Sequence, residues 1–298
     1  MCRVLISPVR NLLFRSCDRP LYLSYLIRMG KRSFSEAMED GITTGKRAAA
    51  VQAVNDHIRD NQVIGIGSGS TIVFAVERIV QRVKEEKLNL VCIPTSFQAK
   101  QLIQEHDLVL GSLERNSELD VAIDGADEAD ANLDLIKGGG GCLTQEKIVA
   151  SCARDFIVVA DSRKDVDKLG TTWKRGVSIE VIPLAYKPIK LKIEKQLGGL
   201  ANLRMASKKA GPVVTDNGNL ILDWIFDETK TYDWEKINFT ITTIPGVVET
   251  GLFVKMAKMV YFGTTDGKVK TRTAPWLTPD TEPSAHKHDK TEANGRST

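Results

Sequence analysis

The stretch that decides the fold is Leu119-Asp-Val-Ala-Ile-Asp124-Gly-Ala-Asp-Glu128, in which a short apolar segment runs directly into acidic residues. The apolar residues from Leu119 to Ile123 predict a short buried strand, and Asp124 then lies at the carboxyl end of that strand. Ligands of open α/β sheets bind at this edge of the sheet. The stretch therefore predicts both a strand and a functional site at its end.

A glycine run follows and leads into a helix. Lys137 precedes Gly138-Gly-Gly-Gly141, and four consecutive glycines are costly unless the backbone must approach a ligand or adopt unusual dihedral angles. The pattern from Thr144 predicts a helix with Glu146 in its first turn, where the helix start favours an ionised carboxylate. Singly, such residues are more often turns and dipole partners. As a set with Asp124 they predict a proton-transfer site.

The composition is that of a soluble globular protein. The 298 residues allow one large or two modest domains, and 42% are apolar and 27% charged. A net charge of +3 makes no case for nucleic acid, and no apolar run approaches the roughly 20 residues of a membrane helix. Five cysteines without a Cys-x-x-Cys pair indicate a reducing compartment, so we expect a cytoplasmic protein. The four histidines have no zinc-site spacing.

The two ends of the chain differ from the rest. Residues 1–40 form an Arg-rich extension in which the first 35 residues hold seven Arg or Lys and one acid. This composition is typical of a mitochondrial or plastid-type targeting sequence, and a disordered extension is the alternative. Residues 271–298 are rich in Pro, Thr, Ser, His and Lys, which predicts a disordered tail.

A second motif predicts a phosphate-binding loop. The apolar strand Gln62–Gly67 runs into Ser68-Gly-Ser-Thr71, and an amphipathic helix follows from Thr71 to Lys87. Free N–H groups at the helix start and small hydroxyl side chains form a nest for an anion. The spacing matches neither the Gly-x-Gly-x-x-Gly dinucleotide motif nor a P-loop, so a nucleotide is not indicated.

Strands and helices alternate along most of the chain, which predicts an α/β fold with a Rossmann-like parallel sheet flanked by helices. We place this domain at residues 41–170 plus 245–270, with the segments 244–248, 251–254 and 259–262 returning to its sheet. A smaller α+β domain is inserted at residues 171–244. Its predicted elements are strands at 177–182, 210–219 and 220–223 and a helix at 189–197.

Over residues 45–270 the chain resembles the type A ribose-5-phosphate isomerases of animals. The resemblance rests on seven motifs in the same order. They are Gly65-Ile-Gly-Ser-Gly-Ser-Thr71, Asp124-Gly-Ala-Asp-Glu128, Leu135-Ile-Lys-Gly-Gly-Gly-Gly141, Glu146-Lys-Ile-Val149, Glu180-Val-Ile-Pro183, Val214-Thr-Asp-Asn-Gly218 and Ile244-Pro-Gly-Val-Val248. The extension and the tail lie outside it.

The resemblance implies interconversion of ribose 5-phosphate and ribulose 5-phosphate without a metal or organic cofactor, by a homodimer or homotetramer. It implies that Glu146 is the general base, that Asp124 assists ring opening, and that Lys137 and Asp127 stabilise the intermediate. The implied substrate-binding residues are Ser68, Gly69, Ser70, Thr71, Gly125, Ala126, Gly138, Gly139 and Lys164, with Arg47 as a second phosphate-binding cation or an exposed helix charge.

Two alternatives share the expected fold. Asp124, Asp127, Glu128 and Asp130 offer hard oxygen ligands that suit a magnesium ion, as in phosphosugar hydrolases. Lys137 would compete for that space. The chain could instead bind a phosphosugar as a non-catalytic sensor, because one fold serves several functions. A sensor would not need Glu146 beside Asp124.

Overall fold

The structure is a computed structural model, and it describes residues 34–277, with side chains from residue 40 onward. Most of the predicted Arg-rich extension, residues 1–33 of 1–40, and most of the predicted tail lie outside the described residues, and residues 34–40 begin a helix. The described residues from 40 onward belong to one compact unit. Within the described range, no helix is both long and apolar enough to cross a membrane.

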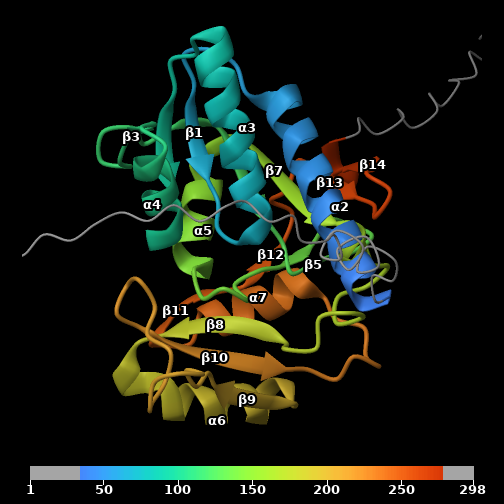
Figure 1. Cartoon of the computed structure of the whole chain (residues 1–298). Helices are drawn as coiled ribbons and strands as arrows, with labels where there is room; N and C mark the ends of the chain where they lie inside the picture. The colour runs from blue at the N-terminus through green and yellow to red at the C-terminus, as the bar shows by residue number, and fades with distance from the viewer. Residues whose placement is uncertain (1–33, 278–298) are drawn as a thin grey trace, which may run out of the picture. The chain divides into compact units, whose positions relative to one another are not determined.

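A seven-stranded sheet forms the centre of this unit (Figure 1). Neighbouring strands are parallel except for one pair at an edge of the sheet, β13 (Met259–Gly263) and β14 (Val269–Thr273), which is antiparallel. In spatial order the strands are β14 (Val269–Thr273), β13 (Met259–Gly263), β7 (Ala153–Asp161), β4 (Leu119–Gly125), β1 (Val63–Ile66), β2 (Val91–Pro94) and β3 (Val109–Leu110). The predicted α/β fold with a largely parallel sheet is therefore confirmed.

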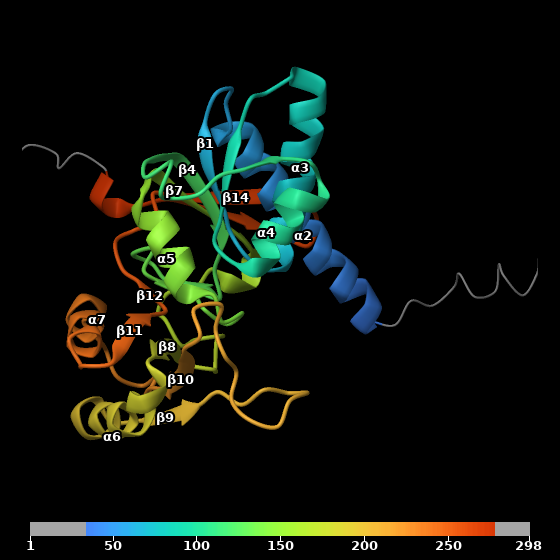
Figure 2. The same cartoon turned by 90° about the vertical axis from the view of Figure 1, so that its left-hand side faces the viewer.

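Helices cover both faces of the central sheet, as Figure 2 shows. On one face lie α2 (Phe34–His57), α3 (Ser70–Glu86) and α4 (Phe97–Glu105), and on the other lies α5 (Leu143–Ser151). Because side chains alternate along a strand, Ile123 packs toward α3 while Ala122 packs toward α5. A side chain at Gly65 would meet Val149 of α5 at 2.6 Å, so glycine there lets helix and sheet approach closely.

A second, antiparallel sheet lies beyond the carboxyl ends of the central strands (Figure 1). Its order is β11 (Val247–Thr250), β8 (Val177–Val181), β10 (Leu220–Ile225) and β9 (Leu200–Leu203). The helices α6 (Tyr186–Leu197) and α7 (Trp234–Thr242) bury Ile189, Ile193 and Ile241 in one apolar cluster with it. A small antiparallel sheet of β5 (Glu128–Ala129), β6 (Leu135–Ile136) and β12 (Leu252–Phe253) lies between the two.

Three predictions about elements are wrong. Residues 210–219 form no strand: the segment has one isolated bridge, Met205 to Pro212, and ends in a turn at Gly218 with φ +80°. Of the segments expected to rejoin the central sheet only 259–263 does so, because β11 pairs with β8 and β12 pairs with β6. Strand β14 runs to Thr273, past the predicted start of the tail. The division into domains at residues 171 and 245 stays a prediction.

Candidate functional site

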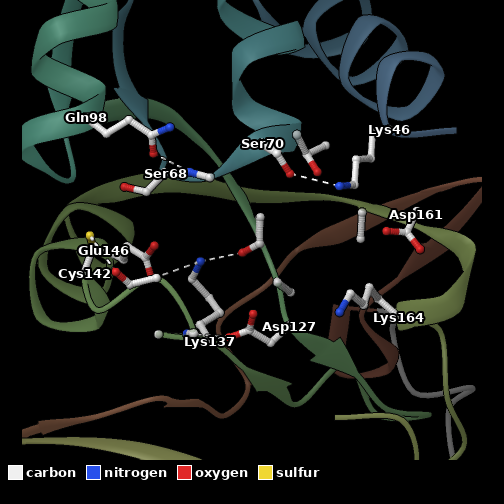
Figure 3. A pocket seen from close by; sticks show the side chains of 18 of the residues that line it. Lys46, Ser68, Ser70, Gln98, Asp127, Lys137, Cys142, Glu146, Asp161 and Lys164 are labelled. Atoms are coloured by element: carbon white, nitrogen blue, oxygen red, sulfur yellow. Dashed lines mark hydrogen bonds and ion pairs between the residues drawn. The ribbon is translucent and has the colours of Figure 1, made fainter. Parts of the chain in front are cut away.

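A pocket of about 280 Å³ lies at the carboxyl ends of β1, β4 and β7 (Figure 3). The strand ends, the glycine run and the first turns of three helices supply its wall. The lining residues are Lys46, Ser68, Gly69, Ser70, Thr71, Gln98, Gly125, Ala126, Asp127, Lys137, Gly138, Gly139, Gly140, Cys142, Glu146, Ala160, Asp161, Arg163 and Lys164. Most of the predicted site residues thus meet in one place.

Asp124 lies directly behind the pocket wall, at the end of β4. Its Oδ1 accepts hydrogen bonds from the backbone N–H groups of Ser68, at 2.9 Å, and Gly125, at 2.7 Å. A side chain at Gly67 would overlap this carboxylate, so glycine is required at the end of β1. The other oxygen, Oδ2, faces the ammonium of Lys137 at 3.0 Å. The two strand ends therefore fix one oxygen and leave the other facing Lys137.

Lys137 joins the two buried carboxylates of the site. Its Nζ lies 3.0 Å from Asp124 Oδ2 and 3.3 Å from Glu146 Oε2, and it donates a hydrogen bond to the carbonyl of Gly125. The lysine side chain is only 2% exposed. Burial lowers the pKa of Lys137, but the carboxylates of Asp124 and Glu146 outweigh burial and raise the pKa above its ordinary value. The ammonium is therefore charged.

Glu146 lies in the first turn of α5, as predicted, and is buried. Burial and the neighbouring Asp124 raise the pKa of Glu146 well above its ordinary value, against the opposing effect of Lys137. The expected stabilisation of an ionised carboxylate by the helix start is thus outweighed. Glu146 Oε2 and Asp124 Oδ2 are buried and have no hydrogen-bond partner among the described residues, with Lys137 as their ion-pair neighbour. Two such oxygens are strong indications of a ligand site.

Asp127 and the glycine run face this cluster. The N–H of Gly139 donates to Asp127 Oδ2 at 2.7 Å, and burial raises the pKa of Asp127 despite that bond. Gly138 and Gly141 have φ of +92° and +87°, which side chains rarely adopt. A side chain at Gly139 would meet Asp127 Oδ1 at 2.6 Å. The glycines therefore allow a turn that places backbone beside the carboxylate.

The other end of the pocket is built from hydroxyl groups and lysines. Gly69, with φ +99°, precedes the first turn of α3. The Ser68 hydroxyl is 2.6 Å from Ser96 Oγ, and Lys46 Nζ donates to Ser70 Oγ at 2.9 Å. In Figure 3 Lys46 and Lys164 lie on one side of the pocket, while Lys137 and Glu146 lie on the other. Cations and a helix start at one end provide a site for an anion.

Known proteins are similar to this chain both in sequence and in fold. The sequence model of the family described as ribose 5-phosphate isomerase A (phosphoriboisomerase A) matches residues 91–267. The chain is 61% identical over 231 residues to the ribose-5-phosphate isomerase of Sus scrofa, covering 78% of this chain and 75% of the relative. This chain belongs to the ribose 5-phosphate isomerase A family.

Two further members of the family extend the comparison. The ribose-5-phosphate isomerase of Homo sapiens is also 61% identical over 231 residues, covering 78% of this chain and 74% of the relative. A solved D-ribose-5-phosphate isomerase in complex with phospho-erythronic acid superposes with a TM-score of 0.72 at 42% identity, over 76% of this chain and 97% of that one. The sequence resemblance is therefore confirmed by relatives and by fold.

One predicted binding residue of this family member is not in the pocket. Arg47 is exposed, pairs with Glu77 at 2.9 Å and lies over the ring of Phe74, with its Cζ 4.4 Å from the centroid. Its neighbour Lys46 lines the pocket instead. Adjacent helix residues point about 100° apart, and the sequence offered no signal for which of the two faces the site. Lys46 is one of several lining residues that were not predicted as site residues, with Gln98, Cys142 and Arg163 among the others.

The magnesium alternative within this family fold requires four carboxylates to converge, and two of them do not. Glu128 accepts hydrogen bonds from the backbone N–H groups of Gly170, Thr172 and Trp173. Asp130 accepts from the N–H groups of residues 132 and 134 in its own turn. Neither carboxylate lines the pocket. Of the four acids, Asp124 and Asp127 therefore lie at the pocket, whereas Glu128 and Asp130 accept hydrogen bonds from loop backbone.

Proposed function

We infer that this chain interconverts ribose 5-phosphate and ribulose 5-phosphate as an aldose–ketose isomerase. Family membership supports the substrate, since the relatives at 61% identity are named ribose-5-phosphate isomerase. The observation that carries the chemistry is the pair of buried oxygens without hydrogen-bond partners, Asp124 Oδ2 and Glu146 Oε2, on either side of the Lys137 ammonium. A base that removes a proton from carbon needs an oxygen that no hydrogen-bond donor occupies, and the ion pair with Lys137 at 3.3 Å holds Glu146 Oε2 in place.

Asp124 is assigned to ring opening. Its carboxylate takes the proton of the carbon-1 hydroxyl, the bond from carbon 1 to the ring oxygen breaks, and the proton passes to that oxygen. The products are the open-chain aldehyde and an unchanged carboxylate, so the step balances. Because Asp124 lies behind the wall and beside Lys137, the substrate must reach it alongside the ammonium.

Glu146 is assigned to the proton transfer between carbons. It removes the proton from carbon 2, and the electron pair forms the carbon 1–carbon 2 double bond while the aldehyde oxygen becomes an enediolate oxygen. Lys137 places a positive charge beside that oxygen, and Asp127 orients the hydroxyl groups. The proton of the carbon-2 hydroxyl passes to the carbon-1 oxygen, and return of the carbon-bound proton from Glu146 to carbon 1, with formation of the carbon-2 carbonyl, gives the ketose. A base with a raised pKa suits this role because proton transfer is most efficient when the pKa lies near the working pH.

The phosphate group is assigned to the opposite end of the pocket. The first turn of α3 offers the backbone N–H groups of residues 70 and 71, and Ser68, Ser70 and Thr71 supply hydroxyl donors. Lys46 and Lys164 supply positive charge. Gly125, Ala126 and Gly138 line the wall between the two ends, where the carbon chain of the sugar would lie.

The decisive experiment is an isomerase assay on ribose 5-phosphate in excess EDTA, with wild type beside Glu146→Gln. Turnover by the wild type in chelator, with kcat reduced by about 10²- to 10⁴-fold in the variant and KM largely unchanged, is the expected result. Glu105→Gln, which removes an exposed carboxylate at the end of α4, is the matched control and should keep full activity.

Other outcomes of this assay contradict parts of the assignment. Activity abolished by chelator would favour a metal site among the acids. A raised KM with unchanged kcat in Glu146→Gln would remove Glu146 from the role of base. Tight binding of the sugar phosphate by a wild type without turnover would identify a sensor.

Two proposals concern the whole protein. We propose a homodimer or homotetramer, as the family resemblance implies, and sedimentation velocity of the full chain distinguishes these from a monomer. We also propose a cytoplasmic location, with mitochondrial or plastid-type import through residues 1–40 as the alternative. Imaging of the full chain with a carboxyl-terminal fluorescent fusion, beside a version without residues 1–33, separates the two.

A further inference from the structure

Trp173 lies beside one of the lysines at the phosphate end of the pocket. The Nζ of Lys164 is 5.2 Å from the centroid of the Trp173 ring, within the range of a cation–π interaction. Lys164 lines the pocket, whereas Trp173 does not. Within residues 40–277, Lys164 has no carboxylate within ion-pair distance, in contrast to its neighbour Arg163, which pairs with Asp161 at 2.6 Å.

The tryptophan is held in place at its backbone and at its ring. Glu128, which is fully buried, accepts a hydrogen bond from the Trp173 N–H at 3.0 Å and others from the N–H groups of Gly170 and Thr172. The indole N–H donates to the carbonyl of Gly176 at 2.9 Å. A buried carboxylate satisfied by several donors fixes the loop around it. Glu128 therefore fixes the loop at residues 170–173 and, through it, the ring.

The same ring reaches the glycine run. A side chain at Gly139 would lie 2.6 Å from Cη2 of Trp173, so the edge of the ring packs directly against this glycine. The edge of the Trp173 ring thus packs against Gly139, whose N–H donates to Asp127, and the face of the ring contacts the ammonium of Lys164. The position of Trp173 links the two ends of the pocket.

We propose that Trp173 is a positioning residue that orients Lys164 toward the phosphate group, with Glu128 as the anchor of its loop. The inference rests on the proposed phosphate-binding role of Lys164. A lysine side chain is flexible and loses conformational freedom when it is fixed. A cation–π contact restricts the side chain without a charged acceptor, so N–H donors of the ammonium stay available for an anion. A carboxylate partner would instead compete with the phosphate group for those donors.

The test is a double-mutant cycle between Trp173→Leu and Lys164→Met, with Trp173→Phe as a milder variant. The measured quantities are kcat and KM for ribose 5-phosphate and the inhibition constant of inorganic phosphate as a competitive inhibitor. We expect Trp173→Leu to raise KM and the phosphate inhibition constant about three- to tenfold, with a smaller rise for Trp173→Phe and kcat reduced less than about threefold. In the Lys164→Met background Trp173→Leu should add less than about twofold.

The control is Arg175→Met. Arg175 also lies over the Trp173 ring, with its Cζ 5.4 Å from the centroid, but it does not line the pocket. Its removal should leave KM and the phosphate inhibition constant unchanged. Thermal melting of each variant shows whether it is folded, and Trp173→Phe carries the test if Trp173→Leu is not.

The outcomes separate this inference from the proposed function. If Lys164→Met leaves KM unchanged, the phosphate-binding role of Lys164 fails, and the inference fails with it. If Lys164→Met raises KM but the tryptophan variants do not, only the inference is overturned. If the effects of Trp173→Leu and Lys164→Met multiply in full in the double variant, Trp173 acts on the structure in general and not through Lys164.

Discussion

The two ends of the pocket hold charged groups in opposite surroundings. At one end Asp124, Lys137 and Glu146 are almost fully buried, and the Lys137 ammonium lies 3.0 Å from the first carboxylate and 3.3 Å from the second. At the other end Lys46 and Lys164 are only half-buried, and Ser70 is exposed. Buried charges interact strongly and shift the pKa values of their neighbours, whereas exposed charges interact through a high dielectric.

The difference indicates a division of labour. Burial adjusts proton affinity, which is what an acid–base reaction on carbon requires. Partial exposure leaves ammonium and hydroxyl donors free to replace the water around a phosphate group. Substitutions at the buried end should therefore act on kcat and those at the exposed end on KM.

The largest effect is expected for Lys137→Met. The change leaves two buried carboxylates without a cation and removes the charge beside the enediolate oxygen. Loss of one partner of a buried ion pair costs about 3–5 kcal/mol of folding free energy, and loss of one stabilising group in a transition state lowers kcat by about 10²- to 10³-fold. Urea denaturation and steady-state kinetics measure the two effects.

Lys147→Met is the matched control for Lys137→Met. Lys147 is also buried and also paired, with Glu249 at 2.8 Å, but it does not line the pocket. It should destabilise the fold and spare kcat. Equal losses of kcat in both variants would show that stability, and not the charge of Lys137, decides the rate.

A smaller effect should distinguish two neighbouring glycines. Gly139→Ala brings a methyl group against Asp127 and Trp173, at 2.6 Å from each, while Gly140→Ala meets nothing within 4 Å. We expect the first to lower kcat/KM about 10- to 100-fold by displacing the Asp127 carboxylate, and the second to stay within about threefold of wild type. Similar losses in both would mean that the backbone flexibility of the run matters more than the space at Gly139.

The pH dependence of the rate should reflect the raised pKa of Glu146. A base must be deprotonated, so kcat falls about tenfold per pH unit below that pKa, and the fall begins well above the ordinary value of 4.5. Profiles of kcat and kcat/KM are compared, because a phosphate monoester itself titrates near pH 6. A flat kcat profile down to about pH 5 would contradict a raised pKa of Glu146 as the base.

The stability of the fold should change with pH in the opposite direction. Between the ordinary pKa of Glu146 and its raised value in the folded chain, the folded state binds more protons than the unfolded state. The contribution of this group to stability is therefore present at low pH and is lost as pH rises through the raised value. The variant Glu146→Gln cannot ionise at this position and should not lose this stability as pH rises. At alkaline pH we expect it to be about 1–3 kcal/mol more stable than wild type. Denaturant titrations of both forms at two pH values measure it.

The smallest effect separates the adjacent cations at the exposed end. Lys46→Met should raise KM about three- to tenfold with little change in kcat, because one phosphate-binding cation is lost. Arg47→Met removes an exposed ion pair and a contact with Phe74, so its KM should stay within about twofold of wild type. A rise in KM for Arg47→Met alone would restore the role first predicted for Arg47.

The sequence was informative where local pattern and tertiary role agree. Strands that run into glycine- and acid-rich loops placed Asp124, Glu146 and the Ser68 loop at one sheet edge, since parallel strands bring their carboxyl ends together. Helix α7 was missed because its sequence, Trp-Glu-Lys-Ile-Asn-Phe-Thr-Ile-Thr, is rich in β-branched and aromatic residues. Its one local signal is Asp233, whose side chain accepts from the N–H of Lys236.

Other features depend on contacts that sequence spacing does not encode. Whether β11 joins the central or the second sheet is decided by pairing with β8, some 70 residues earlier in the chain. The raised pKa of Glu146 depends on burial and on Asp124, which a helix-start argument does not include. The position of Trp173 depends on Glu128, an acid that looked like a member of the catalytic motif.

The arrangement at the two margins of the central sheet bears on behaviour at high concentration. An unpaired strand offers its backbone groups to other chains and so invites aggregation. Strand β3, at one margin, has only two residues. Strand β14, at the other, carries Lys270 and Arg272, both engaged by Asp165. Strand β3 is too short, and β14 too highly charged, to offer an incoming strand a long apolar edge. This arrangement disfavours aggregation through the sheet edges in a crowded solution.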